Sequence, residues 1–131
     1  MKAVRDFAKA KGVNNVLTFA AVEDNIFKRV TSETGYQKFT TFFSDLSIAD
    51  WFGVASIKDT HTRVVRDWLD DYKYFTEYVM ALNHKSWEWN SRGVDELSRL
   101  YADLYYQADE LFCEHYADNE EAKRYYFEVT D

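Results

Sequence analysis

The feature that most constrains the fold is a seam of seven side chains, mostly apolar, in the middle of the chain. Its members follow a strict 4-3-4-3 spacing: His61, Val65, Trp68, Tyr72, Phe75, Val79 and Leu82. Because this spacing returns every member to the same side of an α-helix, it predicts one long helix over residues 55–90 with Trp68 buried. Such a helix would be ~50 Å long, whereas a compact domain of this size is ~35 Å across. We therefore expect it to protrude, bend or break, with Asn83 and His84 as its weakest point.

Shorter elements are expected before this seam. The apolar spacing predicts two helices that end before Gly35. Residues 36–43 are rich in aromatic and β-branched types and could form a minor strand pair with residues 127–130. Ser47 can then cap a short helix that Gly53 closes.

Two helices are expected after Gly93. Asp95 can cap the first of them. Its apolar stripe is Leu97, Leu100, Tyr101, Leu104, Ala108, Leu111 and His115. Asp118 and Glu121 have the spacing of a capping box for a last short helix. We expect the two long helices to pack antiparallel.

The composition favours one helical core. The 131 residues include no proline and four glycines, and hydrophobic residues make up 47%. A chain of this length and composition can bury a stable core without a disulfide or a structural metal ion. We predict an all-α fold, a small helical bundle with one long central helix and at most a minor two-stranded β element. The whole chain, residues 1–131, is expected to form a single helical domain.

The charge is unevenly distributed. Residues 95–131 carry eleven Asp and Glu against three Lys and Arg, whereas residues 1–44 carry four against seven. An acidic field repels nucleic acid and attracts basic proteins, so we expect a basic protein partner and no direct binding of nucleic acid. The lone Cys113 and the lack of a long apolar run predict a cytoplasmic protein that does not enter a membrane. The sequence leaves open whether the chain forms a homo-oligomer.

The patterns that would indicate an enzyme, a cofactor or a metal are missing from the sequence. A bundle metal site favours Glu three positions before a histidine, but Lys58, Ala81 and Phe112 occupy those positions. His61 and His115 fall on apolar stripes, which predicts core or interface histidines. Acidic neighbours should raise the pKa of Cys113. No glycine-rich phosphate loop is present. We predict a protein that is not an enzyme and has no cofactor, with a small enzyme using scattered carboxylates as one alternative.

A second alternative is a DNA-binding regulator. Ile48, Ala49, Phe52, Gly53 and Val54 match the first half of a helix-turn-helix. The second half departs from the motif, because Asp59 occupies a position that is normally apolar. Its would-be recognition surface also mixes Arg63 and Arg66 with Asp67.

Tyrosines interleaved with carboxylates in the last third of the chain are typical of a recognition surface. Tyrosine offers a large contact area at low entropic cost, and carboxylates steer basic partners. Tyr105 and Tyr106 cannot both face one core, because adjacent helical residues point about 100° apart. The predicted partner-binding residues are Tyr105, Tyr106, Asp109, Glu110 and Glu114. A tyrosine-rich rim around an ordinary core is the structural alternative.

Several stretches of the chain resemble small uncharacterised acidic proteins carried by phages and mobile elements of gut bacteria. They are residues 48–53, 57–60, 71–74 and 82–85, together with the ending Tyr125-Tyr126-Phe127 to Asp131. The resemblance implies a biological context but no activity and no site residues. Proteins of that class include anti-CRISPR and anti-restriction inhibitors that imitate DNA. The leading hypothesis is a non-enzymatic protein-binding module of this kind, whose acidic, tyrosine-rich face covers a basic nucleic-acid-binding surface.

Overall fold

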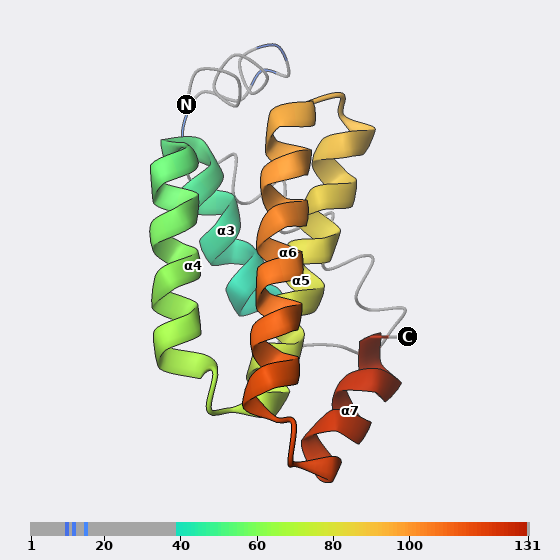
Figure 1. Ribbon diagram of the computed structural model, residues 1–131. Coiled ribbons are helices and arrows are strands. Elements are labelled where there is room, and N and C mark those ends of the chain that lie inside the picture. The colour runs from blue at the N-terminus through green and yellow to red at the C-terminus, as the bar shows by residue number, and fades with distance from the viewer. Residues whose placement is uncertain (1–9, 11, 13–14, 16–38, 131) are drawn as a thin grey trace. The chain divides into compact units, whose positions relative to one another are not determined.

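The computed structural model describes residues 10, 12, 15 and 39–130, and every element of residues 39–130 is an α-helix (Figure 1). The chain divides into two compact units, residues 1–62 and 63–131. The all-α prediction is confirmed for the described residues. The single domain over residues 1–131 stays a prediction, and the helices predicted before Gly35 lie outside the described residues almost entirely.

The first unit contains α3 (Phe39–Phe52) and most of α4 (Val54–Trp68). Gly53 separates these helices with φ +115°, a conformation that favours glycine, which confirms the predicted helix end. The predicted start at Ser47 is wrong, because Ser47 lies inside α3 and its Oγ donates to the Phe43 carbonyl at 2.9 Å. Aromatic residues that suggested a strand after residue 38 are helical here, since burial of Phe42 and Phe43 outweighs their intrinsic β preference.

The predicted long helix over residues 55–90 is wrong, because the chain breaks near Asp71 into α4 and α5 (Tyr72–Ser91). The predicted weak point at Asn83 lies within an unbroken helix. Asp71 caps α5, its Oδ1 accepting from the Tyr74 backbone N–H at 3.2 Å. Aspartate is unfavourable inside a helix and favourable at an N-cap, which makes this the natural place to restart a helix.

The break also changes the burial expected along the seam. His61, Phe75, Val79 and Leu82 are buried, but the exposed fraction of Trp68 is 38%. Trp68 ends α4 and packs edge-on against Tyr74 with a centroid distance of 5.0 Å. The prediction of a buried Trp68 is therefore wrong.

Replacing Asp71 by alanine should lower the free energy of unfolding by ~1 kcal/mol, because the first turn of α5 loses its side-chain cap. Asp71→Ser is the matched control, since serine retains an oxygen that can accept from the same N–H. Urea denaturation followed by circular dichroism measures both variants. Equal stability of the alanine and serine variants would contradict the capping role.

The second unit is built on a hairpin of α5 and α6 (Asp95–His115), which lie side by side and antiparallel (Figure 1). A turn at Gly93, with φ +78°, joins them. Here the Val94 N–H donates to the Trp89 carbonyl at 2.9 Å, which closes α5 in a Schellman motif. Ser86 and Ser98 add a reciprocal link, each hydroxyl donating to the other residue's carbonyl at 2.9 and 3.0 Å. Predicted antiparallel packing is confirmed for this pair.

The buried stripe of α6 differs from the prediction at its C-terminal end. Five residues of the helix are buried: Leu97, Tyr101, Leu104, Ala108 and Phe112. Phe112 and, just after the helix, Tyr116 take the places predicted for Leu111 and His115, and His115 is exposed. A straight helix has 3.6 residues per turn, so a strict 4-3 repeat drifts off the buried side within a few turns.

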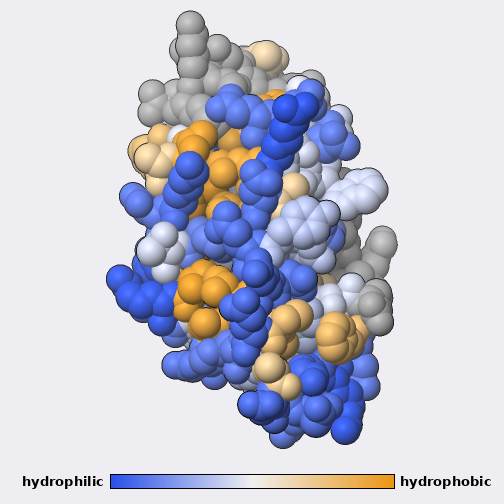
Figure 2. Space-filling view, viewed as in Figure 1, coloured by the Kyte–Doolittle hydropathy of each residue, from blue (hydrophilic) through white to orange (hydrophobic). Residues whose placement is uncertain are grey.

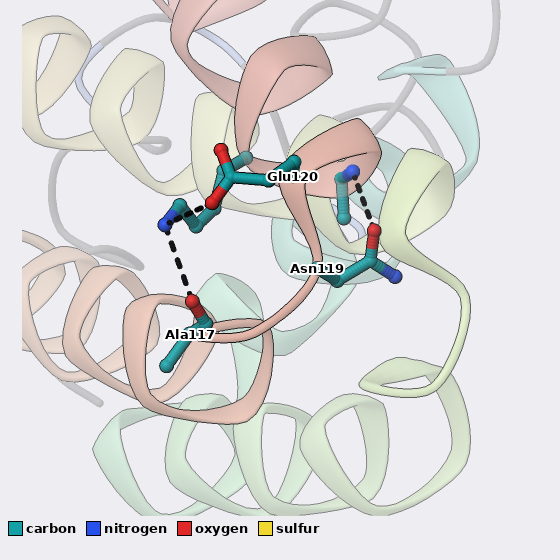
Figure 3. A network of polar contacts seen from close by, with 5 residues as sticks. Ala117, Asn119 and Glu120 are labelled. Carbon is teal, nitrogen blue, oxygen red and sulfur yellow. Dashed lines mark hydrogen bonds and ion pairs between the residues drawn. The ribbon is translucent and has the colours of Figure 1, made fainter.

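The last helix, α7 (Glu120–Thr130), packs on α5 and buries Ala122 and Tyr126. It replaces the strand predicted over residues 127–130. Asn119 is its cap instead of Asp118, with Oδ1 accepting from the Ala122 N–H at 3.0 Å (Figure 3). The predicted last helix is therefore confirmed, with its start displaced by one residue.

Candidate functional site

The predicted partner-binding residues all lie in the second half of α6, where the structure divides them between two sides of the helix. Tyr105 is half-buried and Tyr106 is exposed, so the prediction that they face different ways is confirmed. Their rings meet edge-on with centroids 5.5 Å apart. Burial, with help from Asp109, raises the pKa of Tyr105. The half-buried ring of Tyr105 thus packs against the exposed ring of Tyr106.

Asp109 lies on the same side as Tyr105 and is engaged within the protein. Its carboxylate accepts a hydrogen bond from the hydroxyl of the buried Tyr126. Burial and this carboxylate together raise the pKa of Tyr126 above its ordinary range. Asp109 therefore links α6 to α7, and its replacement would disturb the fold as well as the surface charge.

Four exposed side chains form the acidic face of α6: Asp103, Tyr106, Glu110 and Glu114. Their 3-4-4 spacing places them opposite the side that packs on α5. The exposed fraction of Tyr106 is 67%. The three carboxylates make no ion pair with any other described residue. Figure 2 shows mostly hydrophilic side chains over the visible side of α6. One basic residue, Arg99, lies on this side four positions before Asp103.

Adjacent carboxylates in the second unit have different surroundings. Asp70 pairs with His115, Oδ1 to Nε2 at 2.9 Å, whereas Asp71 caps α5. Glu120 pairs with Lys123 at 3.2 Å, whereas Glu121 accepts from the Tyr72 hydroxyl at 3.1 Å. These pairs therefore do not form joint acidic sites. Within residues 39–130, no three His, Cys, Asp or Glu side chains are placed to hold a metal ion together.

The remaining candidate side chains are two histidines and the cysteine. His61 is buried, as predicted, and burial lowers its pKa. Burial also lowers the pKa of His84. Cys113 is an exposed residue, but its thiol is partly desolvated. This desolvation and, to a smaller extent, the negative charge of Asp109 raise the pKa of the thiol, and the positive charge of Lys123 lowers it by less. The predicted direction for the thiol is confirmed, and it describes a weakly reactive thiol.

The segment considered for DNA binding forms a corner of two helices. Gly53 alone separates α3 from α4, whereas a helix-turn-helix has a turn of about three to four residues. Ile57 is fully buried and Asp59 is exposed. Arg66 is held by Asp67, with Nε and Oδ1 2.8 Å apart. The segment thus departs from the motif in its turn as well as in its sequence.

A pocket that no sequence pattern indicated lies at the junction of α6 and α7. Its volume is ≈ 340 Å³, and it is lined by Phe112, Cys113, Ala117, Lys123 and Phe127. Figure 2 shows pale orange side chains among hydrophilic ones in this region. Ala108, Phe112 and Tyr116 follow one another at intervals of four residues. This spacing could have indicated that Phe112, the floor of the pocket, is buried. Nothing in the local sequence indicated that α7 would fold back beside it.

Comparison of the chain with family models, with curated proteins and with solved structures gives no match. No helix in the described part of the chain is both long enough and apolar enough to cross a membrane.

Proposed function

We propose that this chain is a non-enzymatic cytoplasmic protein that acts by binding another protein. The acidic face of α6 covers a basic, nucleic-acid-binding surface on the partner. Such an activity suits an anti-CRISPR or anti-restriction inhibitor of a phage or mobile element. The observation that carries the proposal is the exposed row of Asp103, Glu110 and Glu114 around the exposed ring of Tyr106.

The surroundings of this face support a role in recognition. Packing on α5 and the Ser86–Ser98 link hold α6 in place. Little conformational freedom is therefore lost when a partner binds. Tyr106 supplies a large contact area supported by Tyr105. The carboxylates add a long-range field that accelerates encounter with a basic surface.

Neutralising the acidic face should slow association with the partner. The test variant is Glu110→Gln with Glu114→Gln, which leaves the Asp109–Tyr126 hydrogen bond intact. The control is Asp59→Asn with Asp67→Asn, two exposed acids of α4 with the same change in net charge. We expect the test variant to lower the association rate constant about 3- to 10-fold at low salt, and the control to change it less than about twofold.

The partner for this measurement is obtained by capture on the immobilised wild-type chain from a host lysate, followed by mass spectrometry. Surface plasmon resonance then gives both rate constants. We expect duplex DNA to displace the captured partner, because both ligands use one basic surface. Capture that survives high salt, DNA and the double neutralisation would overturn the proposal.

Tyr106→Ala should act on dissociation instead. Loss of a desolvated aromatic anchor costs about 2 kcal/mol or more, which corresponds to a roughly 30-fold faster dissociation. The effect should persist at high salt, since it does not depend on charge. Because Tyr106 is exposed in the free chain, the variant should fold normally.

A further inference from the structure

Two aromatic residues line the pocket between α6 and α7. Its floor is Phe112, which is 1% exposed and stacks on Tyr126 with centroids 4.1 Å apart. Its outer wall is Phe127, whose ring is held edge-on against Tyr126 at 5.8 Å. The exposed fraction of Phe127 is nevertheless 51%. An apolar side chain that entered the pocket would cover this exposed ring.

The basic residue in the pocket wall is held by the protein's own groups. The Lys123 ammonium donates to the Ala117 carbonyl and to Glu120, each at 3.2 Å (Figure 3). Its alkyl stem is apolar and can line the pocket while the ammonium stays bound. The bound ammonium is poorly placed to attract an anionic ligand.

Two exposed carboxylates lie close to a pocket residue along α6. Glu110 lies three positions before Cys113 and Glu114 one position after it, and both acids are exposed. The carboxylate of Asp109 affects the pKa of Cys113 more than the ammonium of Lys123 does. The pocket lining is thus mostly apolar, and Glu110 and Glu114 of the acidic face lie next to Cys113 along α6. Groups with the opposite charge and an apolar centre complement it.

We propose that this pocket receives a large apolar side chain from a basic segment of the partner protein, while Glu110 and Glu114 bind the lysines or arginines beside it. The inference rests on the proposed function and names the part of the partner that docks. The apolar side chain covers Phe127, which anchors the complex, and the ionic contacts set the orientation of the segment.

The only cysteine of the chain provides a direct test, because Cys113 lines the pocket. The rate of alkylation of Cys113 by iodoacetamide is measured on the full chain with three synthetic peptides. The first alternates lysine and leucine, the second lysine and serine, and the third glutamate and leucine. We expect the lysine–leucine peptide at saturation to slow alkylation at least about tenfold and the other two to change it less than about twofold.

Variants separate the pocket from the acidic face. Phe127→Ser should remove the protection without unfolding the chain, since that ring is half exposed. Glu110→Gln with Glu114→Gln should weaken binding of both lysine peptides. A bulky maleimide on Cys113 should block the lysine–leucine peptide, whereas Cys113→Ser should still bind it in a fluorescence anisotropy assay.

Two results would overturn the inference in distinguishable ways. Equal binding of both lysine peptides with no protection of Cys113 would remove the pocket and leave the acidic face as the binding surface. Equal protection by the lysine–leucine and glutamate–leucine peptides would show an apolar pocket without preference for basic segments. That second result would leave the proposed function to its own test with the captured partner.

Discussion

Phe112→Ala should lower the free energy of unfolding by about 3–5 kcal/mol, the largest effect expected of any single substitution considered for this chain. Phe112 is at the centre of the aromatic cluster of the second unit. Its ring lies 4.1 Å from Tyr126, 4.6 Å from Tyr116 and 6.3 Å from Phe75, measured between centroids. Removing it leaves a cavity that three rigid neighbours cannot fill.

Trp87→Ala is the matched control for that experiment. Trp87 is also a large aromatic residue, but its exposed fraction is 70%, so its loss should change stability by less than about 0.5 kcal/mol. Urea denaturation followed by circular dichroism gives both values. A loss below about 1 kcal/mol for Phe112→Ala would mean that the cluster relaxes around the missing ring.

Stability should fall steeply as the pH rises above 10, because buried tyrosines keep their protons in the folded state. Burial raises the pKa of Tyr78 well above its ordinary value of 10.0. Below pH 10 the tyrosine is protonated in both states, and its contribution to stability is fully present. Above pH 10 the unfolded chain releases the proton and the folded chain does not, which favours unfolding by about 1.4 kcal/mol per pH unit. Tyr126 acts in the same direction.

Urea midpoints measured between neutral pH and pH 11.5, together with tyrosinate absorbance, test this expectation. Tyr78→Phe keeps the ring and removes the titrating hydroxyl, so its stability should fall less steeply above pH 10. A folded protein whose tyrosines all ionise near pH 10 without loss of structure would contradict the prediction.

The helix ends that were predicted correctly depend on local chemistry. Gly53 and Gly93 have positive φ angles, which cost glycine little, so a helix can end at each without backbone strain. The last short helix was predicted to within one residue, because Asp118 and Asn119 are both good caps and only geometry selects between them. The repeat also placed Leu97, Leu104 and Ala108 correctly on the buried side of α6.

The break between α4 and α5 could not be read from the apolar repeat, which runs through it unchanged. Tertiary contacts stabilise the broken form. The Leu69 carbonyl, which an unbroken helix would use internally, accepts from the Tyr116 hydroxyl. His115 pairs with Asp70 in the same turn. Both partners come from the far end of α6, about 45 positions along the chain, where no local pattern could indicate them.

The candidate site divides in the same way. The sequence alone determined that helices would dominate, that the acids would gather in the last third of the chain, and that Tyr105 and Tyr106 would not both face one core. Those properties follow from residue type and helical period. Only the tertiary structure decided that Asp109 accepts a hydrogen bond from Tyr126 and that Phe112 is central to the aromatic cluster. It also decided that α7 forms a pocket with the end of α6, where Cys113 is one of the lining residues. These depend on how α7 packs, and packing is a property of surfaces that meet only after the chain has folded.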